Sequence, residues 1–313
     1  MKAIPQFLLR PRHSRVDSSS EYERYSAGSM TSTMRVTVVV ENTAQGAQLL
    51  GEHGLAYWLE WDEQRVLFDT GQGRVLAHNA QELSVPLRQA DAVILSHGHF
   101  DHSGGLGIVL RSPRAALYLH PAAAEPKFAR QQGSSPREIG MPSISRLAIA
   151  ASGAPAIATT APTKVLERLT VTGPIPRSTD FEDTGGPFFQ DADCSRADPL
   201  VDDQAVFFET RDGLVVLLGC AHSGVVNTLR YVRNLTHNAP IHAVLGGMHL
   251  IEAAPERLAR TIAEIRTLDI PLLAPAHCTG KTATAALWSA FPGRCTTCHV
   301  GRRFEFEFPE SGN

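Results

Sequence analysis

The sequence lacks the features that mark membrane, nucleic-acid-binding and disulfide-stabilised proteins. It has no apolar run approaching the roughly 20 residues that a membrane-spanning helix needs. The net charge of -3 gives no basic excess for binding nucleic acid or an anionic membrane. The five cysteines are few for 313 residues, and their odd number argues against a disulfide framework. We therefore expect a cytoplasmic protein with a small-molecule partner and no nucleic-acid or membrane partner; a homo-oligomer is left open.

The N-terminal segment differs in composition from the rest of the chain. Residues 1–29 combine arginines with a run of serines. Their one apolar stretch, residues 4–9, is too short and too broken for a signal-peptide core. We predict that residues 1–33 are a disordered leader, or sequence upstream of a start at Met30 or Met34. Residues 34–308 are predicted to form a single domain, and residues 309–313 a tail.

Short apolar runs and amphipathic segments alternate along the predicted domain. The apolar runs predict strands over residues 34–40, 54–60, 64–69, 91–95, 115–119, 166–172, 204–209, 213–218, 241–245, 271–274 and 303–308. The amphipathic segments predict helices over residues 75–83, 104–110, 224–233, 255–268 and 282–291. Each strand-rich half ends with helices, which is typical of an α+β fold in which two mixed sheets pack face to face with helices outside. We expect such an αββα sandwich.

An H-x-H-x-D-H cluster follows the apolar run at residues 91–95. It comprises His97, His99, Asp101 and His102. A protein core does not accommodate three imidazoles and a carboxylate unless something satisfies them. His97 and His99 are expected on one side of the turn, with Asp101 and His102 one step further round. Since zinc-type cations prefer imidazole with some carboxylate, the cluster predicts a site for one or two divalent metals.

Three further apolar strands each end in a histidine. These are His222, His249 and His277. A single histidine at a strand end is usually structural, but strand ends on one edge of a sheet converge in space. Beside the H-x-H-x-D-H cluster, they are therefore candidate ligands. Cys220 and Cys278 lie close to two of these histidines, and we expect them to be packed small residues rather than ligands.

On these motifs the chain resembles the metallo-β-lactamase superfamily. The matching segments include Leu67-Phe-Asp-Thr-Gly71, Leu95–Gly105, Gly219-Cys-Ala-His222, Gly246-Gly-Met-His249 and His277-Cys-Thr-Gly280. Within the superfamily, the chain is most similar to the branch of 7,8-dihydropterin-6-methyl-4-(β-D-ribofuranosyl)aminobenzene-5'-phosphate synthases. The resemblance implies an αββα fold that holds one or two metals between its sheets.

The resemblance also implies a role for each motif residue. The first metal would be bound by His97, His99 and His222, and the second by Asp101, His102 and His277. The carboxylate of Asp69 would steady the ligand loop by hydrogen bonds rather than touch a metal. Zinc is the expected metal, with iron or manganese as alternatives.

One departure from the family pattern concerns the aspartate that bridges the two metals in most dinuclear members. Asp269 is the only aspartate between His222 and His277, and it falls at the end of a predicted helix. His249 occupies the expected strand end instead. It either completes a metal shell or hydrogen-bonds substrate, and we favour the second role. With a single metal, Asp101 and His102 become candidates for the general base and a substrate contact.

The expected chemistry follows from the metal. A zinc-type cation acidifies bound water and polarises a carbonyl or phosphoryl oxygen, which favours hydrolysis. The family resemblance adds a second route, transfer of a pterin-methyl group with departure of a phosphate. Both reactions need an anion-binding group, for which we choose Arg177, in a loop stiffened by prolines. His53 is a further candidate pocket residue, and the loops near residues 120–160 and 173–203 are expected to set specificity.

We therefore expect a metal-dependent hydrolase or transferase that acts on a small anionic metabolite bearing a pterin or a phosphate. A non-catalytic metal sensor or storage protein is the alternative, since it would explain a weakened bridging position.

Overall fold

The computed structural model describes residues 32–111 and 115–309. The predicted leader lies outside the described residues except for Ser32 and Thr33, and Thr33 is the first residue of strand β1. Of the predicted tail, only residue 309 is described. No helix in the described part of the chain is both long enough and apolar enough to cross a membrane.

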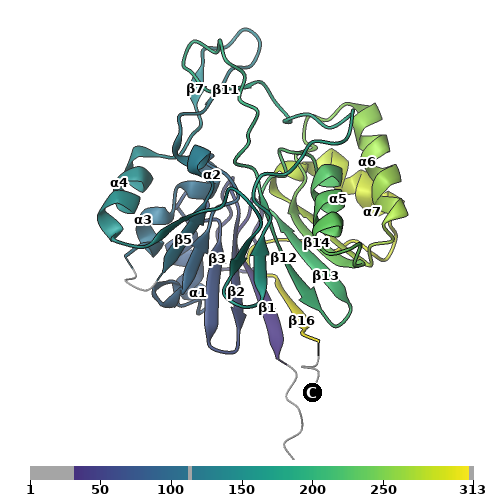
Figure 1. Cartoon of the computed structure of the whole chain (residues 1–313), viewed down its shortest axis with the longest axis horizontal. Coiled ribbons are helices and arrows are strands. Elements are labelled where there is room, and N and C mark those ends of the chain that lie inside the picture. The colour runs from purple at the N-terminus through teal and green to yellow at the C-terminus, as the bar shows by residue number, and fades with distance from the viewer. Residues whose placement is uncertain (1–31, 112–114, 310–313) are drawn as a thin grey trace, which may run out of the picture. The chain divides into compact units, whose positions relative to one another are not determined.

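The first half of the chain, joined by the last strand, forms a mixed sheet of seven strands (Figure 1). Its order is β16-β1-β2-β3-β4-β5-β8. The strands nearest β16 pair antiparallel, and those from β3 to β8 pair parallel. Their bounds are β1 Thr33–Val40, β2 Ala56–Trp61, β3 Gln64–Phe68, β4 Ala92–Ile94, β5 Ala116–Leu119, β8 Ala156–Ala158 and β16 Arg303–Glu307.

The second half forms a mixed sheet of six strands, in the order β15-β14-β13-β12-β10-β9. The β12–β13 hairpin pairs antiparallel, whereas β13, β14 and β15 run parallel. Their bounds are β9 Thr163–Val165, β10 Leu169–Val171, β12 Ala205–Thr210, β13 Gly213–Leu218, β14 Ile241–Gly247 and β15 Leu272–Ala276.

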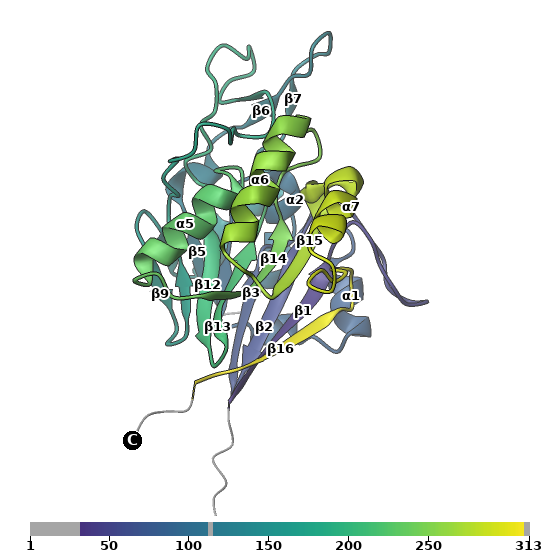
Figure 2. The ribbon, with the colours of Figure 1, turned by 90° about the vertical axis from the view of Figure 1, so that its right-hand side faces the viewer.

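Three apolar layers hold the sheets and helices together. The central layer lies between the two sheets and contains Val36 and Phe68 from the first and Phe208 and Leu245 from the second. A second layer joins the first sheet to α1 (Leu76–Glu82) and α3 (Leu106–Val109). A third joins the other sheet to α5 (Val225–Leu235), α6 (Pro255–Thr267) and α7 (Lys281–Ala290), which cover its outer face in Figure 2. The αββα sandwich is confirmed.

The strand ends of this fold determine where functional side chains gather. Because β3, β4 and β5 are parallel in one sheet, and β13, β14 and β15 in the other, each set of carboxyl ends shares an edge. The segments that follow β4, β13 and β15 carry the predicted ligand histidines.

Several elements differ from the sequence prediction. The helix expected over residues 104–110 is the short helix α3. A further single turn that was not predicted, α2 (Phe100–Ser103), precedes it, so that two of the clustered ligand candidates are helical. Residues 120–160 contain a helix that was not predicted, α4 (Ser143–Ser152), whose Ile144 and Leu147 are exposed. A small sheet, also not predicted, joins β6 (Phe128–Ala129), β7 (Arg137–Glu138) and β11 (Phe188–Phe189).

Candidate metal centre

The H-x-H-x-D-H cluster lies where β4 ends and α2 begins. His97 and His99 occupy the connection, while Asp101 and His102 belong to the single turn of α2. All four side chains are buried. Four side chains of types that can bind a metal therefore point into the protein rather than into solvent.

The backbone of the cluster is fixed at Gly98, between the first two histidines. Its N–H donates to Asp202 Oδ2 at 2.8 Å. A Cβ at this position would lie 2.1 Å from the carbonyl oxygen of Ala123, so no larger residue fits. The other oxygen of Asp202 accepts from buried Lys127 at 2.8 Å, and Lys127 also donates to Asp198 at 3.0 Å. The long 173–203 segment thus ties the ligand loop to the small sheet.

His97, His99 and His222 form one converging group. One ligand atom from each lies within 4.8 Å of the other two. His222 reaches the group from the segment after β13, and its Nδ1 donates to the carbonyl of Thr184 at 2.8 Å. Because a carbonyl can only accept, this bond leaves the lone pair of the neutral ring on Nε2. The buried Nε2 atoms of His99 and His222 have no hydrogen-bond partner among the described residues, as expected of atoms that bind a metal.

Asp101, His277 and His53 form a second group around the same centre. Asp101 Oδ2 lies 3.2 Å from His277 Nε2 and 3.1 Å from His53 Nε2. His102 joins them, with its Nε2 3.3 Å from His277 Nε2 and 3.8 Å from Asp101 Oδ2. The side chain of His53 is 56% exposed, whereas the other three are buried. His53 thus lies at the solvent side of this group.

The outer ring nitrogens of these histidines bind groups that orient them. Asp69, completely buried, accepts from His102 Nδ1 at 2.7 Å and from the N–H and hydroxyl of Ser96, each at 2.7 Å. Asn42 Oδ1 accepts from His277 Nδ1 at 2.8 Å. Asp69 therefore lies where its predicted role requires. Hydrogen bonds of this type orient the histidines of metal sites so that the opposite nitrogen faces the metal.

Burial and nearby charge decide which groups carry protons. Burial holds the pKa below its ordinary value for four imidazoles, namely His97, His99, His222 and His277. Burial also lowers the pKa of His102, but the charges of Asp69 and Asp101 outweigh it and raise that pKa to about 9. Burial opposes ionisation of Asp101, yet His102, His277 and His53 hold its pKa well below the usual range. Neutral imidazoles beside an ionised carboxylate are the donor set that zinc-type metals prefer.

Comparison with known proteins places this arrangement in a family. Residues 50–277 match the family model of the Metallo-beta-lactamase superfamily. The chain belongs to the metallo-β-lactamase superfamily.

Two proteins of Methanocaldococcus jannaschii are similar to this superfamily member along most of its length. One, named 7,8-dihydropterin-6-methyl-4-(beta-D-ribofuranosyl)-aminobenzene-5'-phosphate synthase, is 25% identical over 287 residues, covering 86% of this chain and 95% of the relative. The other, an uncharacterized protein, is 28% identical over 257 residues, covering 80% and 93%. A crystal structure of a metal-dependent hydrolase of the beta-lactamase superfamily matches with a TM-score of 0.74 and 28% identity, covering 88% of this chain and 99% of that one.

Two adjoining cavities open beside the predicted metal ligands of this metallo-β-lactamase-fold protein. The inner one, of about 130 Å³, is lined in part by His99, Asp101, His222 and His277. The outer one, of about 520 Å³, extends over the small sheet. The two cavities share six lining residues: His53, Ala129, Arg137, Phe188, His249 and Ile251. A cavity of about 640 Å³ beside Arg168 and Phe308 is larger but contains none of the predicted ligands, so size alone does not identify the site.

The predicted substrate-binding residues do not all meet at these cavities. His53 and His249 line both, whereas Arg177 lines neither and donates to the carbonyl of Pro199 at 3.0 Å. Arg137, which the sequence analysis did not select, is the arginine of both linings; its guanidinium lies 5.9 Å from the Phe100 ring centre. No motif marks Arg137, because the small sheet that carries it assembles from distant segments. A binding role for Arg177 stays a prediction.

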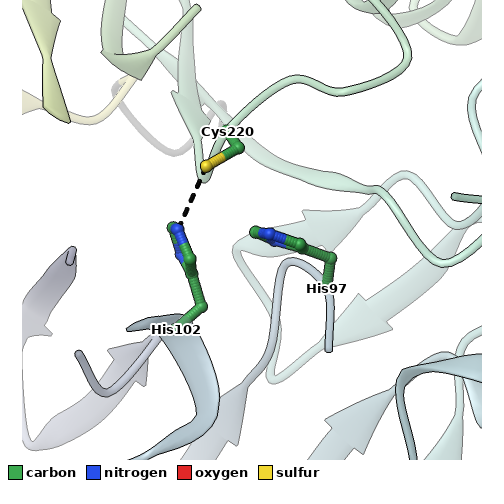
Figure 3. A group of neighbouring side chains, drawn as sticks. All are labelled: His97, His102 and Cys220. Atoms are coloured by element: carbon green, nitrogen blue, oxygen red, sulfur yellow. Dashed lines mark hydrogen bonds between the residues drawn. The ribbon is translucent and has the colours of Figure 1, made fainter. Parts of the chain in front are cut away.

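Asp269 does not occupy the metal-bridging position that the superfamily pattern leads one to expect. Asp269 is 82% exposed and bonds to Arg294 at 2.6 Å, so it is not at the centre. The ring of His249 lies 4.2 Å from that of His222, and burial, the main cause, lowers the pKa of His249 to about 4. Its ligand atoms join none of the converging groups found among the described residues. Cys220, however, points into the centre, with its Sγ 3.1 Å from His102 Nε2 (Figure 3).

Proposed function

We propose that this protein is a metal-dependent hydrolase or transferase that acts on a small anionic metabolite bearing a phosphate or a pterin. The carrying observation is the pair of converging groups, together with the unpartnered, buried Nε2 atoms of His99 and His222 in the first group. In this proposal, His97, His99 and His222 hold one divalent metal, and Asp101, His102 and His277 hold a second. When bound, a divalent metal supplies Lewis-acid polarisation of a carbonyl or phosphoryl oxygen and makes water more acidic.

The chain's own residues would supply binding and proton handling. Asp101 is ionised and faces His53 and His277, so it is the candidate proton acceptor or ligand. The charges of Asp69 and Asp101 outweigh burial and raise the pKa of His102 to about 9, so a metal bound by its ring would displace a proton. His249, neutral at pH 7, lines both cavities and is available to hydrogen-bond substrate.

The substrate class is argued from the cavity lining and from one relative. The guanidinium of Arg137 matches a phosphate or carboxylate, and the ring of Phe188 offers a flat apolar surface beside it. The relative that is 25% identical carries the name of a synthase of a pterin-bearing phosphate ester, which supports the same class. Zinc is the metal we expect, with iron or manganese as alternatives.

The substrate proposal is tested by assaying a set of phosphoesters and pterin phosphates with two arginine variants. For the substrate that is turned over, Arg137→Ala is expected to raise KM by about 10-fold or more, which corresponds to the loss of one charge-assisted contact. Arg177→Ala is expected to leave KM unchanged. A KM effect confined to Arg177→Ala would instead support the binding role predicted from the sequence.

The alternative, a metal sensor or storage protein, is separated by an Asp101→Asn variant. For an enzyme, this variant is expected to lower kcat/KM by about 100-fold or more, while the exposed-carboxylate variant Glu63→Gln keeps full activity. Metal content is measured on both. Absence of turnover in the metal-loaded wild type on every phosphoester, pterin phosphate, lactone and amide tested would favour the sensor.

A further inference from the structure

Cys220 lies between the two groups of predicted ligands. It belongs to the segment after β13, two residues before His222, and its side chain is buried. Ala221 has a left-handed φ of 55°, which turns the chain between these two residues. Figure 3 shows the sulfur pointing toward His102, at 3.1 Å from Nε2, with His97 beside it.

The sulfur faces ligands of both predicted metals. With His97 and His102 it forms a group whose ligand atoms lie within 4.8 Å of one another. It forms a second such group with His277 and Cys278. His97 is a predicted ligand of the first metal, whereas His102 and His277 are predicted ligands of the second. Within these groups, Cys220 is therefore close to one predicted ligand of the first metal and two predicted ligands of the second.

Two other residues are less suited to this position. His249 offers a neutral imidazole, which cannot bridge two cations through one nitrogen, and it joins none of the groups. Cys278 is close, but its Sγ lies 3.6 Å from the carbonyl oxygen of Cys220 and faces the backbone there. A thiolate sulfur carries a full charge and several lone pairs, so Cys220 can bind one metal or lie between two.

We propose that Cys220 is a thiolate ligand of this metal centre, lying between its two groups of predicted ligands. The proposal rests on the metal-dependent function proposed above. Binding exchanges the Cys220 S–H bond for a sulfur–metal bond and releases one proton to solvent, with no change of oxidation state. Because thiolate is a soft ligand, the centre would select zinc, iron(II) or cobalt(II) over magnesium, calcium and manganese.

The first test is made on the full wild-type chain loaded with zinc, so that it does not depend on the folding of a variant. X-ray absorption at the zinc edge is expected to show a sulfur shell at about 2.3 Å in addition to nitrogen and oxygen. A shell of nitrogen and oxygen alone would overturn the proposal. Failure of the chain to bind any zinc would also overturn the proposed function, so the two failures are distinguishable.

The second test assigns the sulfur with matched variants. Cobalt(II)-loaded wild type is expected to show the near-ultraviolet charge-transfer band of a cobalt–thiolate bond. Cys220→Ser is expected to lose the band and to bind the second metal at least about 10-fold more weakly, whereas Cys278→Ser keeps both. Retention of the band in Cys220→Ser, or its loss only in Cys278→Ser, would overturn the assignment.

Discussion

The Asp69→Asn substitution tests how the fold prepares the metal ligands. In the structure, Asp69 accepts from His102 Nδ1 and from both donors of Ser96, all at 2.7 Å. Since a carboxylate only accepts, His102 must carry a proton on Nδ1, and its Nε2 faces Cys220 and His277. The substitution keeps the shape of Asp69 and removes its charge.

The effect on His102 follows from the hydrogen bonds that asparagine can make. If the asparagine oxygen still accepts from the backbone N–H of Ser96, the asparagine NH₂ group faces His102 Nδ1. That ring nitrogen must then accept, and the neutral ring carries its proton on Nε2, the atom that faces the metal ligands. Loss of such a supporting group lowers metal affinity by about 10- to 100-fold, which corresponds to about 1.4–2.7 kcal/mol.

The assay is competition for zinc against a chromophoric chelator, with Asp69→Asn compared with Glu63→Gln, an exposed carboxylate in the β2–β3 turn. Nitrogen-15 chemical shifts of the histidine rings report the tautomer in the same samples. We expect weaker zinc binding, and loss of the proton on His102 Nδ1, only in Asp69→Asn. Unchanged zinc affinity together with an unchanged His102 tautomer would refute the reasoning.

Two further predictions concern stability. With metal removed by chelator, the unfolding free energy should fall as pH drops below about 6.5, by up to about 1.4 kcal/mol per pH unit for each buried imidazole. Burial lowers the folded-state pKa values of His97, His99, His222 and His277, so the unfolded chain binds more protons than the folded chain as pH drops. His102 has the opposite effect: its folded-state pKa is raised, and its contribution to stability is lost as pH rises through about 9. Denaturant titrations with equal midpoints at pH 7.5 and 5.5 would contradict this sign. Lys127→Met should destabilise the fold by about 3–5 kcal/mol, because it leaves two buried carboxylates, Asp198 and Asp202, without their cation; a loss below about 1 kcal/mol would contradict the role of this triad.

The strands and helices that sequence patterning predicted are those with a continuous buried apolar run or with one buried face. In β1 and β13 almost every residue is buried, and α5 and α6 have one buried face. The helix α4 was missed because Ile144 and Leu147 are exposed, so its apolar residues do not mark a core-facing stripe. The small sheet was missed because β6, β7 and β11 have only two residues each and β11 pairs across a long separation.

The ligand candidates could be selected from the sequence because strand order brings strand ends to a shared edge. Two other positions, Cys220 and Arg137, could not be selected from the sequence. The orientation of Cys220 depends on the left-handed backbone of Ala221, which alanine does not signal in a sequence. The choice between Arg177 and Arg137 depends on where loops fold, and neither lies on an element with a periodic pattern.

The central claim is a metal centre built from both groups of ligands. Its most direct test is the metal content per chain, measured by elemental analysis on protein purified without chelator and then reconstituted with zinc. We predict about two zinc ions per chain in the wild type and about one in His277→Ala. One ion in the wild type would contradict the second site, and none would contradict the metal-dependent function.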